Sequence, residues 1–176
     1  MILRVLSGKY KNRKLKSLKG NSVRPTTSLV KKSIFDTLNL FEGKKVLDLF
    51  SGIGSLGIES LSRGAKEVVF VEKNRKISKT LFDNLNSICL NDNFQVFHQD
   101  VIYFLENNND LYDIIFADPP YGLFDFDTLK YKVCKLLKYG GIFCMEQRKD
   151  KMINIEGARV KQYGNTQVII WEKKKK

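Results

Sequence analysis

The stretch that decides the fold is Val46-Leu47-Asp48-Leu49-Phe50-Ser51-Gly52-Ile53-Gly54-Ser55-Leu56-Gly57. Its first five residues are apolar apart from Asp48, which is typical of a buried strand. The three glycines then form the pattern G-x-G-x-x-G at the start of a helical segment. A strand that enters a glycine-rich turn and a helix is typical of a nucleoside-binding α/β sheet.

Outward from this stretch, strand and helix patterns alternate along the chain. Strands are predicted over 46–50, 67–72, 94–97, 114–117, 142–145, 160–163 and 166–171, and helices over 29–41, 52–62, 75–90, 101–105 and 123–137. Gly164-Asn165 separates the last two strands and favours a hairpin. The alternation predicts an α/β, Rossmann-like fold with a seven-stranded, mostly parallel sheet, helices on both faces and a C-terminal antiparallel hairpin.

The N-terminal segment is expected to form a small basic β-hairpin arm from strands over 2–7 and 14–17. Thr26, Thr27 or Ser28 can cap the helix that follows. We therefore expect a basic arm over 1–28, a Rossmann-like domain over 29–172 and a lysine tail over 173–176.

Charge is concentrated at the two ends of the chain. The 176 residues include 31 basic and 19 acidic side chains, and residues 1–32 contain ten of the basic ones and no acid. The net charge suggests a polyanionic partner, either nucleic acid or an anionic membrane surface. The dense charge of the N-terminal segment among aliphatic residues favours nucleic-acid contact over a merely solvated arm. The predicted phosphate contacts are Lys9, Lys11, Arg13 and Lys14, with Arg24 as a further RNA-binding residue.

Cysteine and histidine usage indicates neither a metal site nor a disulfide framework. The three cysteines occur without a C-x-x-C pair, which fits a reduced, cytoplasmic location. The single histidine, His98, has no visible partner for a triad or metal site, so we expect a structural role. No apolar run approaches the ~20 residues of a membrane span. A monomer is expected.

Acidic residues follow the predicted parallel strands where a ligand is expected. Glu72 comes 20 residues after Gly52 and can accept hydrogen bonds from ribose hydroxyls. Asp100 follows the third strand and can meet an exocyclic amine of adenine. The predicted cofactor-binding residues are Asp48, Phe50, Ser51, Gly52, Gly54, Gly57, Glu72, Lys73, Asp100, Val101 and Asp118. The glycine pattern by itself fits a nicotinamide dinucleotide or S-adenosyl-L-methionine.

The fourth strand is followed by Asp118-Pro119-Pro120-Tyr121. Pro120 cannot extend a sheet ladder, and each proline pushes the preceding residue toward an extended conformation. We expect a stiff corner with free carbonyls. Because the carboxyl ends of parallel strands share one edge of a sheet, this corner should meet the glycine-rich loop.

These motifs resemble those of S-adenosyl-L-methionine-dependent methyltransferases that act on exocyclic amines of nucleobases. The resemblance is closer to the RsmD-type bacterial 16S rRNA guanine-N2 methyltransferases and runs from about residue 2 to 172. It is carried by Gly8-Lys9-Tyr10-Lys11-x-Arg13-Lys14-Leu15, by Arg24-Pro25-Thr26-Thr27 and by residues 51–64, SGIGSLGIESLSRG. Ile53 departs mildly from the small residue that this family often has there.

The resemblance implies methylation of a guanine N2 amine in 16S rRNA, free or in a partly assembled small ribosomal subunit. Asp118 and the Pro119 carbonyl would accept the amine hydrogens, and Tyr121 would stack on the base. Pro120 completes the catalytic corner, and Arg24 would reach the base or the carboxylate of the methyl donor. No metal is required.

Three other functions are compatible with parts of the sequence. An N6-adenine methyltransferase would use the same corner, although the chain leaves no room for a separate target-recognition domain. A nicotinamide-dependent oxidoreductase would use the glycine-rich loop but leaves the corner and the arm unexplained. A non-catalytic RNA-binding factor would retain the fold alone.

Overall fold

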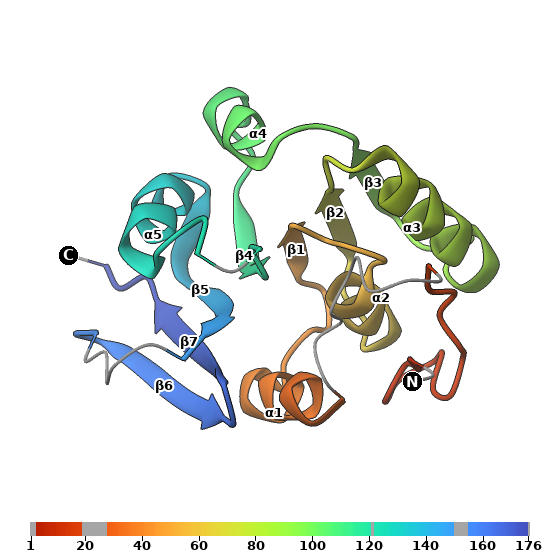
Figure 1. The fold of residues 1–176 in the computed structure, drawn as a ribbon, viewed down its shortest axis with the longest axis horizontal. Helices are drawn as coiled ribbons and strands as arrows, with labels where there is room; N and C mark the ends of the chain where they lie inside the picture. The colour runs from red at the N-terminus through yellow and green to blue at the C-terminus, as the bar shows by residue number, and fades with distance from the viewer. Residues whose placement is uncertain (1–2, 19–27, 121, 150–154, 176) are drawn as a thin grey trace.

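The computed structural model describes residues 3–18, 28–120, 122–149 and 155–175. It contains a seven-stranded sheet with the strand order β3-β2-β1-β4-β5-β7-β6 (Figure 1). The elements in chain order are α1 (Ser28–Leu38), β1 (Lys45–Leu49), α2 (Ser55–Ser62), β2 (Glu67–Val71), α3 (Arg75–Ile88), β3 (Phe94–Phe97), α4 (Val101–Asn107), β4 (Tyr112–Ala117), α5 (Phe126–Cys134), β5 (Leu137–Arg148), β6 (Ala158–Tyr163) and β7 (Thr166–Glu172). The first five strands are parallel, and β7 is antiparallel to both β5 and β6. The predicted fold class is confirmed.

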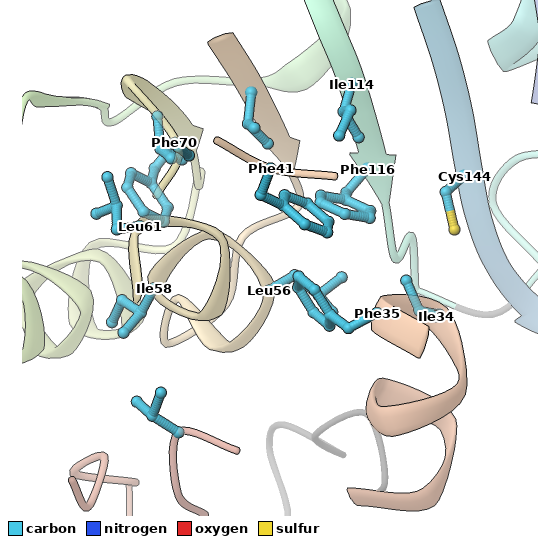
Figure 2. Packing of buried hydrophobic residues seen from close by; sticks show 14 of the residues in the cluster. Ile34, Phe35, Phe41, Leu56, Ile58, Leu61, Phe70, Ile114, Phe116 and Cys144 are labelled. Atoms are coloured by element: carbon cyan, nitrogen blue, oxygen red, sulfur yellow. The ribbon is translucent and has the colours of Figure 1, made fainter. Parts of the chain in front are cut away.

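Helices cover both faces of the sheet because apolar side chains of the central strands alternate between two cores. In β1, Val46 belongs to the core under α1, α2 and α3, whereas Leu47 belongs to the core under α4 and α5. Figure 2 shows the first core, in which the rings of Phe35, Phe41 and Phe116 pack together between α1 and β4. The centroids of Phe35 and Phe116 lie 5.9 Å apart. This packing seats α1 beside β4.

One predicted boundary is wrong. The helix expected over 123–137 is shorter, and β5 begins at Leu137 rather than at Ile142. Asp125 sets the start of α5, because its side chain accepts a hydrogen bond from the Thr128 amide at 2.8 Å. Leu137 is buried and pairs with Tyr112 of β4, so the strand already begins where the helix was expected to end.

The N-terminal arm has the expected antiparallel pairing, but it contains one isolated bridge, between Arg4 and Lys14, instead of two regular strands. The Val5 amide donates to the Arg13 carbonyl at 3.0 Å, and the Leu15 amide donates to the Leu3 carbonyl at the same distance. Leu3, Val5 and Leu15 are buried in the core under α1, α2 and α3. The arm is therefore packed onto the sheet domain. The separate domain limit at residue 28 remains a prediction.

Some expectations fall on residues outside the described ranges. Among these are Ile2 of the first predicted strand and the candidate helix caps Thr26 and Thr27. Ser28, the third candidate, is the first residue of α1. Over the described residues, no helix combines the length and hydrophobicity needed to cross a bilayer.

Candidate active site

The pairing of β1 with β4 brings the glycine-rich loop and the Asp118 corner to the same edge of the sheet. Leu49 and Ala117, the last residues of the two strands, are register partners. Beyond them, the ring of Phe50 lies 5.5 Å from the ring of Phe124, which follows the corner. The two motifs that were expected to meet are therefore neighbours.

The glycine-rich loop is shaped by close packing as well as by its turn. Gly52 and Gly54 have φ values of 55° and 89°, in the region that disfavours side chains. A Cβ on Gly57 would lie 2.1 Å from Cε1 of Phe70, so this glycine lets α2 approach β2 closely. Phe50, which is not a glycine, also has a positive φ of 56°. The first helical turn is thus fixed against the sheet.

Asp48 and Ser51 lie beneath the loop. The buried Asp48 carboxylate accepts a hydrogen bond from the Gly57 amide at 2.9 Å. Burial raises the pKa of Asp48 to about 8, although the Gly57 N–H opposes this shift. The Ser51 hydroxyl donates to the Asp48 carbonyl and accepts from the Val71 amide, so it ties β1 to β2. Both side chains support the loop, and their contact with a cofactor remains a prediction.

Glu72 directly follows β2 and faces the same loop. Its Oε2 accepts a hydrogen bond from the Gly52 amide at 3.0 Å, and its Oε1 accepts one from the Asn74 amide at 2.7 Å. The carboxylate is oriented by both bonds, and each oxygen has further acceptor capacity. An acid held in this way at the end of the second strand fits the ribose of a nucleoside cofactor.

Asp100 caps α4, where its Oδ1 accepts a hydrogen bond from the Ile102 amide at 2.8 Å. Its side chain is about half exposed, and Oδ2 lies 3.8 Å from Nζ of Lys73. Val101 is buried in the core under α4 and α5, so it supports the neighbouring turn. His98 Nε2 lies 3.0 Å from the Lys73 carbonyl, an arrangement that suits the structural role expected for this histidine.

The corner that follows β4 differs from expectation in one respect. The Pro120 carbonyl, expected to be free, accepts a hydrogen bond from the Leu123 amide at 3.2 Å, which closes a turn after the prolines. Asp118 is half-buried, Pro119 is buried and Pro120 is exposed. Tyr121 lies outside the described residues. The roles of Asp118 and of the Pro119 carbonyl as acceptors for a substrate amine remain predictions.

The predicted phosphate contacts in the arm divide into two kinds. Lys9 forms an ion pair with Asp92, which raises the pKa of Lys9, and Arg13 Nη2 donates to the Ser87 carbonyl at 2.7 Å. These two cations hold the arm against α3 and the loop after it, although both side chains are exposed. Lys11 and Lys14 are exposed as well. Arg24 lies outside the described residues.

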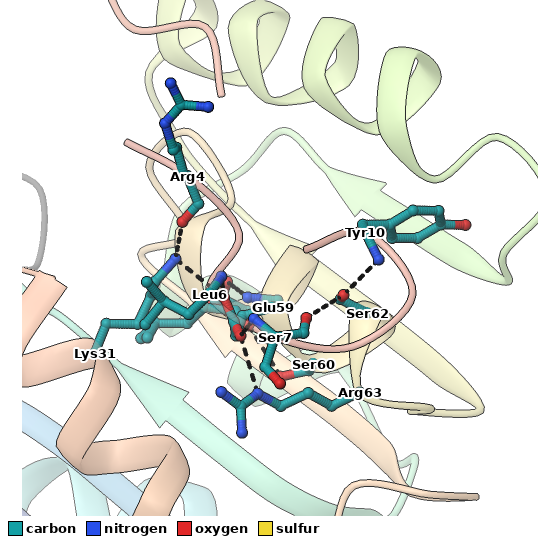
Figure 3. A network of polar contacts seen from close by, with 12 residues as sticks. Arg4, Leu6, Ser7, Tyr10, Lys31, Glu59, Ser60, Ser62 and Arg63 are labelled. Atoms are coloured by element: carbon teal, nitrogen blue, oxygen red, sulfur yellow. Dashed lines mark hydrogen bonds and ion pairs between the residues drawn. The ribbon is translucent and has the colours of Figure 1, made fainter. Parts of the chain in front are cut away.

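A buried ionic cluster that the sequence interpretation missed fixes the arm to α1 and α2. The fully buried Glu59 carboxylate accepts hydrogen bonds from the amides of Leu6 and Ser7, at 2.7 and 3.0 Å (Figure 3). Nζ of Lys31 and Nε of Arg63 lie 3.2 and 2.9 Å from its oxygens. Lys31, one of the ten N-terminal cations, is therefore buried. In the sequence, the only indication that Lys31 is buried is its helical spacing relative to the apolar residues of α1.

Metal ligands and a reactive cysteine are two further kinds of group that could serve a site among the described residues. Within the described ranges, no three histidine, cysteine, aspartate or glutamate side chains gather as a metal site. The Cys144 thiol is buried, which raises its pKa, so it is not poised as a nucleophile. The feature that remains is the Glu72 carboxylate, a hydrogen-bond acceptor that two backbone amides hold beside the glycine-rich loop.

The family model described as Conserved hypothetical protein 95 matches residues 3–172. The chain belongs to this family. One relative is the Bacillus subtilis protein named "Putative rRNA methyltransferase YlbH", which is 36% identical over 183 residues that cover 98% of this chain and 100% of that protein. The Ribosomal RNA small subunit methyltransferase D of Haemophilus influenzae is 34% identical over 158 residues, 85% of this chain and 80% of that protein. The family resemblance is confirmed.

Solved structures support the fold of this Conserved hypothetical protein 95 member. A hypothetical protein from Thermus thermophilus superposes with a TM-score of 0.84 at 27% identity and covers 97% of this chain and 99% of its own. An RNA methyltransferase from Salinibacter ruber, solved with S-adenosyl-L-homocysteine, superposes with a TM-score of 0.69 at 15% identity, over 87% and 95% of the two chains. The expected Rossmann-like methyltransferase fold is confirmed.

Proposed function

We propose that this protein transfers a methyl group from S-adenosyl-L-methionine to the N2 amine of a guanine in 16S rRNA. The observation that carries the proposal is the pairing of β1 with β4, which sets the Asp118 corner beside the glycine-rich loop. Two relatives are named Ribosomal RNA small subunit methyltransferase D, and these names support ribosomal RNA as the class of substrate.

The residues around the loop fit the proposed cofactor. Glu72 would accept hydrogen bonds from the ribose hydroxyls, and Asp100 would accept one from the adenine amine. The N-terminus of α2, directly after this loop, would favour the carboxylate of the methionine part through the positive end of the helix dipole. When bound, S-adenosyl-L-methionine supplies an electrophilic methyl group on a sulfonium. The chain's own task is then to position the acceptor nitrogen.

The corner would carry out that positioning. The lone pair of a guanine 2-amino group is delocalised into the ring, so its nitrogen must be held in line with the methyl–sulfur bond. Asp118 and the Pro119 carbonyl would each accept one amine hydrogen, which favours a pyramidal nitrogen and stabilises its developing positive charge. As the nitrogen–carbon bond forms and the carbon–sulfur bond breaks, the surplus proton leaves the nitrogen, with Asp118 as the proposed acceptor. Tyr121 would stack on the flipped base.

The arm would bind the RNA backbone. Lys11 and Lys14 are exposed on an arm that is fixed to the domain by Glu59, so their charges are held in place. Such contacts neutralise phosphates and orient the RNA without reading its sequence. We propose that the protein acts as a cytoplasmic monomer on 16S rRNA, free or in a partly assembled small subunit.

Nucleoside analysis of small-subunit rRNA tests this function. In a strain that lacks the protein, one N2-methylguanosine should disappear from 16S rRNA, and purified protein with S-adenosyl-L-methionine should restore it. The same experiment with naked 16S rRNA and with small subunits identifies the form of the substrate. Loss of an N6-methyladenosine instead would favour the adenine methyltransferase, and unchanged rRNA would contradict the proposal.

A further inference from the structure

A second carboxylate, that of Glu146, lies one strand away from Asp118 at the same edge of the sheet. In the pairing of β4 with β5, Phe116 is opposite Cys144 and Ala117 is opposite Met145. Asp118 directly follows β4, and Glu146 is the next residue of β5, so the two acids come one position after the last register pair. Adjacent strands in a sheet are separated by about 4.8 Å, so the two acids start from closely spaced backbones.

The alternation of side chains places both acids on the face that α1 covers. Phe116 and Cys144 belong to the same core, and Figure 2 shows them beside Ile34 of α1. Asp118 and Glu146 each come two residues later, so they continue along that face toward the carboxyl edge. The ring contact between Phe35 of α1 and Phe116 holds the helix over this part of the sheet.

Glu146 is held within the protein rather than exposed to solvent. Only 6% of the residue is exposed, and the pKa of the nearby Cys144 thiol is raised first by burial and then by the charge of Glu146. Its register partner in β7 is Val168, a core residue. A buried carboxylate is tolerated where it is hydrogen-bonded or paired with a charge, and its two oxygens together can accept several hydrogen bonds. Its position beside the corner favours recognition.

We infer that Glu146 is the residue that selects guanine, by accepting a hydrogen bond from the N1–H of the target base. The inference rests on the proposed function and extends it to base specificity. Guanine presents two neighbouring donors on its Watson–Crick edge, N1–H and the N2 amine. Two carboxylates on adjacent strands match that pattern, with Asp118 at the amine and Glu146 at N1–H.

The same carboxylate would reject adenine. Adenine carries an unprotonated N1 next to its amine, so its lone pair would face the Glu146 carboxylate without a proton between them. A buried acceptor opposite an acceptor loses its hydrogen bond and adds repulsion, which is an effective means of discrimination. The single residue would thus distinguish a guanine-N2 from an adenine-N6 methyltransferase.

The test compares guanine with 2-aminopurine, which retains the N2 amine but has an unprotonated N1. The target position in 16S rRNA is filled with either base, and kcat/KM is measured for the wild-type protein and for Glu146→Gln. We expect the wild-type protein to prefer guanine at least 100-fold. Glutamine can donate to the 2-aminopurine N1, so the preference should fall at least tenfold in the variant. The control is Glu172→Gln. Glu172 is exposed and pairs with Ile142, four residues before Glu146 in β5, so this variant should retain the wild-type preference.

Two results would overturn this assignment. One is an unchanged preference in Glu146→Gln with normal S-adenosyl-L-homocysteine affinity, which would leave Glu146 a purely structural role. The other is equal methylation of guanine and 2-aminopurine by the wild-type protein, a measurement that does not depend on the stability of the variant. Both presuppose that the wild-type protein methylates guanine N2, so a wild-type protein inactive on guanine would contradict the proposed function itself.

Discussion

The rings of Phe50 and Phe124 lie 5.5 Å apart with an interplanar angle of 44°, and this contact joins the glycine-rich loop to the segment after the Asp118 corner. Phe50 adopts a positive φ of 56°, a conformation that a bulky residue accepts only when its surroundings hold it there. The contact therefore indicates that the relative position of the two loops is built into the fold. In the proposed enzyme it would set the distance between methyl donor and acceptor.

Truncation of this contact should affect catalysis more than stability. We expect Phe124→Ala to lower kcat/KM for RNA methylation by about tenfold or more, since small displacements of reacting groups are costly. Thermal unfolding and steady-state kinetics measure the two effects. Tyr131→Ala, at an 85% exposed position on α5, is the control and should change neither. A Phe124→Ala protein with wild-type activity would show that the ring contact does not position the loops.

Gly57→Ala should destabilise the fold because the new methyl group meets a ring of the core. The Cβ would lie 2.1 Å from Cε1 of Phe70 and 3.0 Å from Oδ2 of Asp48. Overpacking of this kind costs about 1–3 kcal/mol. Denaturant unfolding measures the loss, with Lys79→Ala on the exposed face of α3 as the control. An unfolding free energy equal to that of the wild type would contradict the close packing of α2 on β2.

Asp48 should give the stability a pH dependence with a definite sign. Its pKa is raised to about 8 in the folded protein, so between about pH 4 and 8 the folded state binds a proton that the unfolded state has released. This group's contribution is present at acidic pH and is lost as the pH rises through 8. We expect the difference in unfolding free energy between the wild type and Asp48→Asn to shift in favour of the variant as the pH rises from 5 to 8. A difference that does not change with pH would contradict the raised pKa.

Replacement of the arm cations should separate those that only bind RNA from those that also hold the arm in place. Lys11→Gln and Lys14→Gln should each weaken RNA binding and reduce the salt dependence of the affinity by about one phosphate contact, with unchanged stability. Lys9→Gln should in addition loosen the arm, since Lys9 pairs with Asp92. Filter binding across a salt series, with Lys79→Gln as the control, measures these effects. Salt slopes identical to the wild type would exclude the arm from the RNA interface.

The sequence was sufficient to predict the elements whose signals are local. The first strand, the glycine turn and Glu72 were found because residue type and spacing determine them. The methyltransferase family was also predicted correctly. The start of β5 was missed because the pairing of Leu137 with Tyr112 overrides the helical pattern around it.

Long-range contacts account for the features that the sequence did not reveal. Besides Arg63 four residues later, Glu59 has partners at positions 6, 7 and 31, which are far away along the chain and give no local sign of its burial. The packing of the arm against the core and the hydrogen bond to the Pro120 carbonyl were likewise not predicted from the sequence. The roles of Tyr121 and Arg24 remain predictions.

The central claim is that the Asp118 corner methylates a guanine amine, and its most direct test is Asp118→Ala. The measurement is N2-methylguanosine formed in 16S rRNA, together with RNA affinity and S-adenosyl-L-homocysteine affinity. Asp127→Ala, an exposed acid in the first turn of α5, is the matched control. We expect Asp118→Ala to reduce methyl transfer at least 100-fold with RNA affinity nearly unchanged, whereas methylation at the wild-type rate would contradict a role of Asp118 in the reaction.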